Sequence, residues 1–174
     1  LTGILLLYNN MLQSLFDSQI KSLGFVMLII AAMFLILFKS IALMVIGIIP
    51  NLISALLVLG IMGIMKLPLD MMTITIAAIT VGIAVDNSIH YIYRFKEELK
   101  ISGDYKKTIL ICHSTIGKAI FFTGITVIFG FSILILSNFI PTIIFGVLTG
   151  FAMLVALIAV LTLLPRMLIS FKPI

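Results

Sequence analysis

Charged residues are scarce in this chain. Asp, Glu, Lys and Arg make up only 10% of its 174 residues, whereas they make up about 25% of a typical soluble domain. Hydrophobic residues account for 63% of the sequence, and the mean hydropathy is +1.38. This balance excludes an ordinary soluble domain and indicates an integral membrane protein.

Residues suited to cross-linking and catalysis are also few. The single cysteine, Cys112, cannot form a disulfide within the chain. An intramembrane aspartyl protease needs two carboxylates that share a proton, and a zinc protease needs a His-Glu-x-x-His motif. The sequence has one acid inside its apolar runs and no such motif, and His113 has no second metal ligand at a suitable spacing. We therefore expect no enzyme activity, no metal and no cofactor.

Long apolar runs are what the sequence has in abundance. A helix needs about 20 apolar residues to cross a bilayer. We predict an all-α integral membrane protein that forms a five-helix transmembrane bundle. Its spans cover about residues 22–38, 41–65, 71–93, 119–138 and 142–165, and a cytoplasmic loop covers residues 94–118. The first span is the shortest, but Lys21 and Lys39 can extend their ammonium groups to the two interfaces.

Residues 1–20 differ from the spans because their polarity alternates with a helical period. One broad face is apolar and comprises Ile4, Leu7, Tyr8, Met11, Leu12, Leu15 and Phe16. The opposite face is polar and comprises Asn9, Asn10, Gln13, Ser14 and Asp17. We predict an amphipathic helix here that leads into a transmembrane domain of residues 21–174. Because the chain begins at Leu1 rather than Met, we expect it to be a piece of a longer protein.

Basic residues cluster on one side of the predicted membrane. If the first span runs inward, nine of the 11 basic residues lie on the inner side, and only Lys21 and Lys66 lie outside. The positive-inside rule then places the first residue of the chain in the periplasm and the last in the cytoplasm. The net charge of +5 therefore reflects topology. No basic patch interleaves with aromatic residues, so we do not expect a nucleic-acid partner.

Asp86 is the only formal charge between Met71 and Tyr93. Ionisable residues inside membrane helices usually have functional roles. His90 follows four residues later, so its side chain lies on the same helical face as Asp86, together with Gly82 and Tyr93. A membrane interior disfavours the charged form of either group, which lets a proton move between them at modest cost. We therefore predict a proton relay of Asp86 and His90.

Four further residues are predicted to support this relay. Gly82 leaves room beside the acid, and Asn87 adjoins it. Thr123 and Thr126 are candidate partners of Asp86 from the fourth span. A structural alternative stays open for each polar residue. Asp86 could merely hydrogen-bond a neighbouring helix, His90 could be an interfacial side chain, and the two threonine hydroxyls could bond back to their own helix.

The run from Gly82 to His90 closely resembles the GxxxDxxxH motif of the RND (resistance-nodulation-division) superfamily, specifically its MMPL-type exporters. The resemblance covers nearly the whole chain. Further matches to the family pattern are Pro50-Asn51, Leu67-Pro68-Leu69-Asp70, Gly130-Phe131 and Leu163-Leu164-Pro165. Asn87 is a departure, because some relatives have a second acid directly after the first.

The resemblance implies a protein of twelve membrane helices in two similar halves, each with a large periplasmic domain inserted after its first helix. The present spans would be the last five, and residues 1–20 would lead out of the second periplasmic domain. The implied function is efflux of lipids or other hydrophobic molecules by proton antiport, with protons as the coupling ion. The implied location is a bacterial inner membrane, which the protein crosses many times.

The resemblance also implies partners. These are membrane lipids, the missing N-terminal half and periplasmic domains of the same protein, and a hydrophobic or lipidic substrate. The resemblance also allows a homo-oligomer. Asp86 would bind the proton, His90 would relay it, and any partner acid would come from the other half. The alternative is a non-transporting relative of the same fold, either a sterol-sensing-like lipid-binding domain or a protein-export accessory subunit. An accessory subunit would have a much shorter parent chain.

Overall fold

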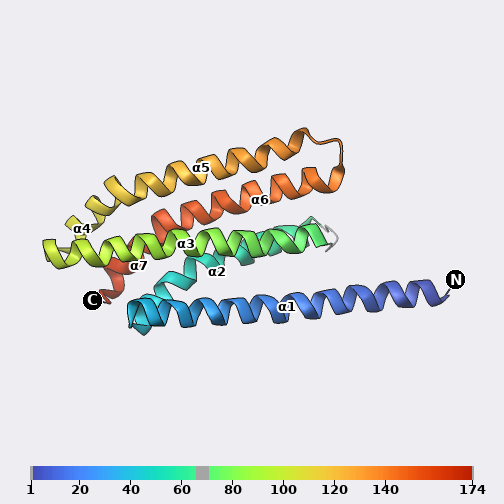
Figure 1. The fold of residues 1–174 in the computed structure, drawn as a ribbon, viewed down its shortest axis with the longest axis horizontal. Coiled ribbons are helices and arrows are strands. Elements are labelled where there is room, and N and C mark those ends of the chain that lie inside the picture. Colours follow the sequence, from blue (N-terminus) through green and yellow to red (C-terminus); the bar gives the residue numbers. More distant parts are fainter. Residues whose placement is uncertain (1, 66–70, 174) are drawn as a thin grey trace.

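The computed structural model describes residues 2–65 and 71–173, and their regular secondary structure is helical throughout. The chain runs back and forth along one long axis, so that its helices lie side by side (Figure 1). The N-terminal and C-terminal ends lie towards opposite ends of this axis. The predicted all-α architecture is therefore confirmed.

The first helix, α1, spans Thr2–Phe38 and is uninterrupted over its 37 residues. It contains both the predicted amphipathic segment and the predicted first span. The described polar side chains of its first half are exposed, namely Asn9, Asn10, Gln13 and Ser14. The side chains of Ile4, Tyr8, Leu12, Leu15, Phe16 and Asp17 lie outside the described part of the structure. The complete amphipathic pattern of residues 1–20 therefore stays a prediction.

A tight reversal joins α1 to α2 (Ile41–Ile64). Lys39 has a positive φ of 50° and ends α1, while the Ser40 hydroxyl accepts a hydrogen bond from the Leu43 N–H at 3.5 Å. The two helices then pack closely where the Phe34 ring lies against Gly47. A Cβ atom at position 47 would overlap that ring, so the close approach of α1 and α2 depends on this glycine.

The third helix, α3 (Met71–Ser102), packs against both α2 and α6. The predicted outer turn that precedes it, including Lys66 and Asp70, lies outside the described residues. α3 contributes large buried side chains to the main hydrophobic core. The buried members of this core include Phe34, Leu43, Ile46, Val81, Val85, Tyr91, Ile92, Phe95, Leu157, Val160, Leu164 and Leu168. Residues from α1, α2, α3, α6 and α7 thus share one core.

A short helix, α4 (Tyr105–Cys112), follows α3, and Asp104 caps it by accepting a hydrogen bond from the Lys106 N–H at 2.9 Å. The π-helical turn η1 (His113–Gly117) joins α4 to α5 (Lys118–Ser132), which ends in a 3-10 turn. Most of the segment 94–118, which the sequence analysis assigns to a loop, is therefore helical.

The last rod of the bundle begins with α6 (Ile140–Ile158). A second π-helical turn, η3 (Ala159–Leu163), joins it to α7 (Leu164–Phe171). α6 and α5 pack closely, because Gly124 lies against the Leu157 side chain and Gly146 against Leu134 and the Phe131 carbonyl. The side chains of Leu157 and Leu134 fill the space that Gly124 and Gly146 leave.

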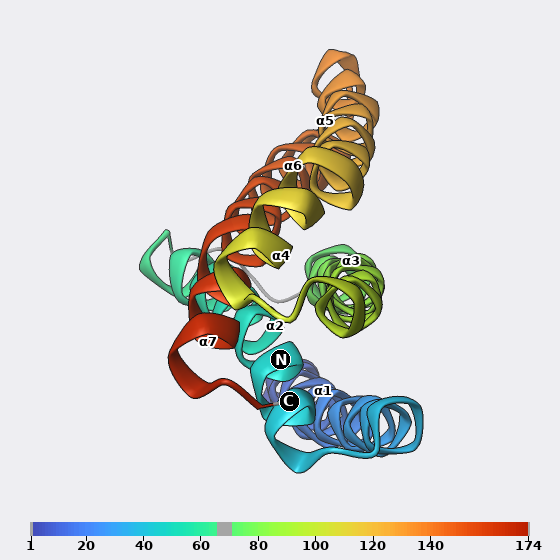
Figure 2. The same ribbon diagram turned by 90° about the vertical axis from the view of Figure 1, so that its left-hand side faces the viewer.

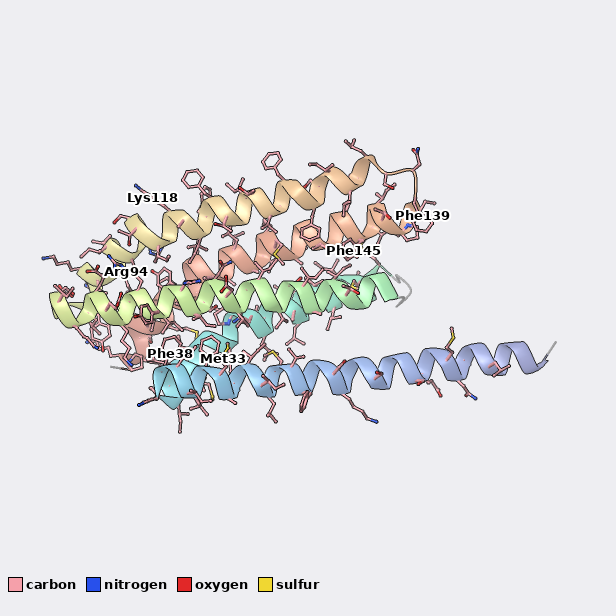
Figure 3. The ribbon with its side chains drawn as sticks, in the orientation of Figure 1. Met33, Phe38, Arg94, Lys118, Phe139 and Phe145 are labelled. Carbon is pink, nitrogen blue, oxygen red and sulfur yellow. The ribbon has the colours of Figure 1, made fainter. Side chains whose placement is uncertain are left out.

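α2, α3 and α6 contact one another and form the middle of the bundle. α5 packs against α6 on one side of this group, and α1 packs against α2 on the opposite side (Figures 1 and 2). Figure 3 places Phe38, Arg94 and Lys118 towards one end of the bundle and Phe139 at the other. The end that contains Arg94 and Lys118 also contains the loop between α3 and α4, and is called the basic end below.

The structure corrects the predicted number of helices. Within residues 2–65 and 71–173 there are seven α-helices rather than five, because π-helical turns interrupt two rods. Three stretches of the described residues are long and apolar enough to cross a membrane: Ile41–Ile64, Tyr105–Leu136 and Ile140–Phe171. The apolar part of α1, Gly24–Phe38, is shorter. That α1 and α3 also cross the membrane stays a prediction.

Candidate functional site

Asp86 and His90 lie together on α3. The His90 Nε2 atom is 3.4 Å from the Asp86 Oδ1 atom, across one helical turn. Both side chains are open: 68% of the Asp86 side chain and 60% of the His90 side chain are exposed. The structure therefore brings the predicted acid and base into contact, and it places them at the surface of this chain.

The two faces of α3 differ sharply. Gly82, Asp86, His90 and Tyr93 all lie on the exposed face, as their spacing predicts. A Cβ atom at Gly82 would meet nothing within 4 Å, so the space beside the acid is empty of other parts of this chain. The opposite face is buried in the core and includes Val81, Ala84, Val85, Ser88, Tyr91 and Ile92. We call the exposed face, defined by Gly82, Asp86, His90 and Tyr93, the open face of α3.

Arg94 is the nearest basic side chain along the helix, but its charge is engaged elsewhere. Its Nη2 atom lies 2.6 Å from the Glu98 Oε1 atom, and its Nη1 atom lies 3.8 Å from the Glu97 Oε2 atom. These ion pairs point away from Asp86 along α3 and towards the basic end. Among the described residues, His90 is the one cationic candidate in contact with the Asp86 carboxylate.

A polar contact on the buried side of α3 was not among the predicted site residues. The Asn51 side-chain amide donates to the Ser88 hydroxyl at 3.3 Å and to the Gly47 carbonyl at 2.7 Å. The Ser88 hydroxyl donates in turn to the Ala84 carbonyl at 3.0 Å. This contact joins α2 to α3 two residues beyond Asp86. The position of Asn51 directly after Pro50, within an apolar span, was the available sequence signal.

The structure does not gather the other predicted supporting residues around the acid. Asn87 is half-buried beside the open face. Thr123 and Thr126 lie on α5, which packs against α6 rather than against α3 (Figure 1). The Thr126 hydroxyl donates to the Phe122 carbonyl of its own helix at 2.9 Å, which is the structural alternative stated above. Within this chain, Gly82 is thus the supporting residue that lies on the open face itself.

A second histidine occupies a junction of three segments. The Tyr91 hydroxyl lies 2.8 Å from the His113 Nδ1 atom, and the His113 Nε2 atom lies 3.1 Å from the Leu161 carbonyl oxygen. Because a carbonyl oxygen only accepts, Nε2 carries a proton, and in the neutral imidazole Nδ1 accepts from the Tyr91 hydroxyl. Pro165 has no N–H to offer the carbonyl four residues before it, so His113 supplies the missing donor to Leu161.

The described residues contain no cluster of three or more His, Cys, Asp or Glu side chains that could hold a metal ion. The contact between the Asp86 carboxylate and the His90 imidazole is suited to proton transfer between the two groups. The sequence pointed to this pair through its spacing. It gave no comparable signal for the contacts of His113, since its two partners lie 22 and 48 residues away.

Comparison with known proteins adds independent findings. The sequence model of the MMPL family matches residues 1–171. The membrane protein MJ1562 of Methanocaldococcus jannaschii is 30% identical over 69% of this chain and 31% of its own length. The membrane protein YdgH of Bacillus subtilis is 31% identical over 98% of this chain and 20% of its own length. The chain thus spans less than a third of either relative. No solved structure matches it.

Proposed function

Because the chain belongs to the MMPL family, we propose that it is the C-terminal membrane part of an RND-type exporter driven by the proton-motive force. The contact between Asp86 and His90 on the open face of α3 carries this proposal. Asp86 takes up the proton, and His90 passes it towards the basic end. The cargo is a lipid or another hydrophobic molecule, as the family resemblance implies.

The exposure of the pair supports a partner outside this chain. A charged side chain at the middle of a membrane helix costs about 2.5–3.5 kcal/mol when it faces lipid. That cost falls when protein or water covers the charge. The missing N-terminal half of the same protein would cover the open face, and Gly82 leaves room for its close approach. Asp86 would then be enclosed in the assembled protein although it is exposed in this chain.

The distance along the helix suits a relay. Four residues of α-helix advance by about 6 Å, so His90 stands one turn closer to the basic end than Asp86. By the positive-inside rule that end faces the cytoplasm and the first residue of this chain lies in the periplasm. The proposed location is the inner membrane, as the family resemblance implies. A proton that moves from Asp86 to His90 then moves inward. That direction can drive export of a substrate.

The size of one relative favours the exporter over the accessory-subunit alternative. An accessory subunit of the same fold needs only a short parent chain, whereas the 177 residues of YdgH that match this chain are 20% of its length. A protein of that length has room for a second membrane half and for large domains outside the membrane. MJ1562 is much shorter, since its 120 matched residues are already 31% of its length, and it does not separate the two alternatives. A sterol-sensing-like lipid-binding domain would not carry a proton flux. A measurement of proton flux therefore separates it from the exporter.

The test measures proton uptake by the full-length protein in liposomes under an imposed pH gradient. We expect flux for the wild type and for Glu97→Gln, which makes the same carboxylate-to-amide change further along α3. We expect loss of flux for Asp86→Asn, because an amide cannot take up the proton. Flux by Asp86→Asn at the wild-type rate would contradict the relay. Absence of flux from correctly folded wild type would favour the lipid-binding alternative.

A further inference from the structure

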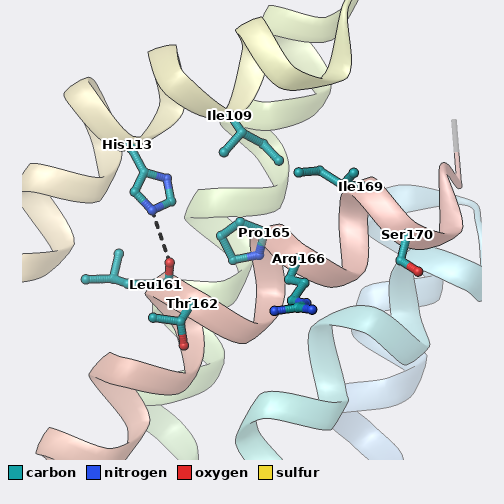
Figure 4. A pocket seen from close by; sticks show the side chains of 8 residues that line it. All are labelled: Ile109, His113, Leu161, Thr162, Pro165, Arg166, Ile169 and Ser170. Atoms are coloured by element: carbon teal, nitrogen blue, oxygen red, sulfur yellow. Dashed lines mark hydrogen bonds between the residues drawn. The ribbon is translucent and has the colours of Figure 1, made fainter.

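A groove lies between α4 and the η3–α7 region, at the basic end of the bundle (Figure 4). Its volume is about 660 Å³, within the range of about 300–1,000 Å³ that is typical of small-molecule sites. Ile109 from α4 and Leu161, Pro165 and Ile169 from the last rod provide its apolar lining. Arg166 and Ser170 provide polar groups at the same groove. The groove is therefore amphipathic.

The surroundings of the groove carry positive charge. No Asp or Glu occurs after Asp104 in the sequence. Lys106 and Lys107 lie on α4, next to one wall, and Arg166 lies in the groove itself. An anionic group would therefore be attracted to this end of the bundle, and no carboxylate of the lining would repel it.

Two donors in the groove are free to bind an anion. Both side chains are exposed, and within the described part of the chain neither makes a side-chain hydrogen bond or an ion pair. They are four residues apart on α7, so their side chains project from the same face. The exposed guanidinium offers several N–H donors in a planar fork that suits phosphate oxygens, and the Ser170 hydroxyl can add one more.

The remaining polar groups of the lining are already satisfied. The Thr162 hydroxyl donates to the Ile158 carbonyl at 2.7 Å. Both ring nitrogens of His113 are engaged, with the Tyr91 hydroxyl and with the Leu161 carbonyl, and Figure 4 shows the second of these contacts at the edge of the groove. An anion in the groove would therefore bind at Arg166 and Ser170. The rest of the lining would offer it apolar contacts.

From these observations we propose that the groove binds an anionic phospholipid. Its phosphate binds Arg166 and Ser170, and an acyl chain lies against Ile109, Leu161 and Pro165. The order of the groups fits the membrane, because Leu161 is nearer than Arg166 to the middle of the apolar stretch Ile140–Phe171. Basic grooves between membrane helices on the cytoplasmic side are suited to acidic lipid headgroups. The proposal requires a membrane location and does not depend on proton transport.

The test is native mass spectrometry of the full-length protein in detergent with added phosphatidylglycerol or phosphatidylcholine at equal concentration. We expect Arg166→Gln to lower the affinity for phosphatidylglycerol about tenfold and to leave phosphatidylcholine binding unchanged. Lys118→Gln is the matched control, since Lys118 lies at the same end of the bundle but outside the groove. This control should bind phosphatidylglycerol like the wild type.

A second variant tests the acyl-chain wall. Ile109→Asp places a carboxylate in the groove and should weaken phosphatidylglycerol binding as much as Arg166→Gln or more. Soluble glycerol phosphate, added at the lipid concentration, should not displace the lipid, because it lacks the acyl chain. The proposal is wrong if Arg166→Gln and Lys118→Gln lower the affinity equally. It is also wrong if glycerol phosphate competes as well as the lipid does, since the site would then be one for a free anion.

Discussion

His90 and His113 occupy contrasting surroundings. His90 lies on the open face of α3, contacts one carboxylate and is 60% exposed in its side chain. Both ring nitrogens of His113 are engaged, and the residue joins α3, η1 and η3. An imidazole whose two nitrogens are held by other groups has no free nitrogen for exchanging a proton with a further partner. The comparison therefore supports the proposed proton chemistry at the open face and indicates a structural role for the junction at His113.

The largest expected effect is on the open face. Asp86→Asn should reduce export by cells that produce the full-length protein to the background of cells without it, with unchanged protein levels in the membrane. The amide keeps the shape of the side chain and loses the ability to bind a proton. The measurements are cargo efflux and quantitative immunoblotting. Wild-type export by this variant would contradict the proposed role of the open face in proton transfer and would leave it no functional difference from the junction at His113.

The next largest effect concerns the stability of the junction. His113→Ala leaves the Tyr91 hydroxyl and the Leu161 carbonyl without partners, and each loss costs about 1–3 kcal/mol. We expect a loss of about 2–3 kcal/mol in the free energy of unfolding, measured by denaturant titration of the full-length protein in micelles. His113→Gln is the matched rescue, because its amide can both donate and accept. Equal stability of the alanine variant and the wild type would show that the junction is dispensable.

A smaller effect is expected at the other histidine. His90→Ala should lower the rate of proton-driven export about tenfold, equivalent to about 1.4 kcal/mol, and should shift the dependence of the rate on pH. Water can replace the imidazole in part, so export should not be abolished. His113→Gln serves as the control and should keep the wild-type pH dependence. A His90→Ala variant with an unaltered pH profile would make His90 a structural residue.

The smallest effect tests the other half of the junction. Tyr91→Phe removes the donor to the His113 Nδ1 atom but keeps the aromatic ring in the core. One net hydrogen bond is worth about 1 kcal/mol, so we expect a loss of that size in the free energy of unfolding and no change in the pH dependence of export. The double variant with His113→Ala should be little less stable than His113→Ala alone. Additive losses would indicate that the two residues act independently.

Local periodicity explains which features the sequence predicts well. Long apolar runs define the helices, and the spacing of Gly82, Asp86, His90 and Tyr93 fixes them on one face whatever α3 packs against. Which helices become neighbours depends on the whole bundle. Periodicity therefore could not reveal that α5, which carries Thr123 and Thr126, packs against α6 rather than against α3. The exposure of the acid was unpredictable for the same reason, since it depends on which helices pack beside α3.

The π-helical turn at Ala159–Leu163 determines the direction in which the side chains of α7 project. An α-helix turns by about 100° per residue, and a π-turn accommodates about one residue more than an α-turn. The rod therefore changes its angular phase at η3. α6 packs against α2, α3 and α5, whereas α7 packs against α2 and α4. Without that extra residue, Arg166 would be rotated by about a quarter of a circle or more, away from the wall that α4 provides.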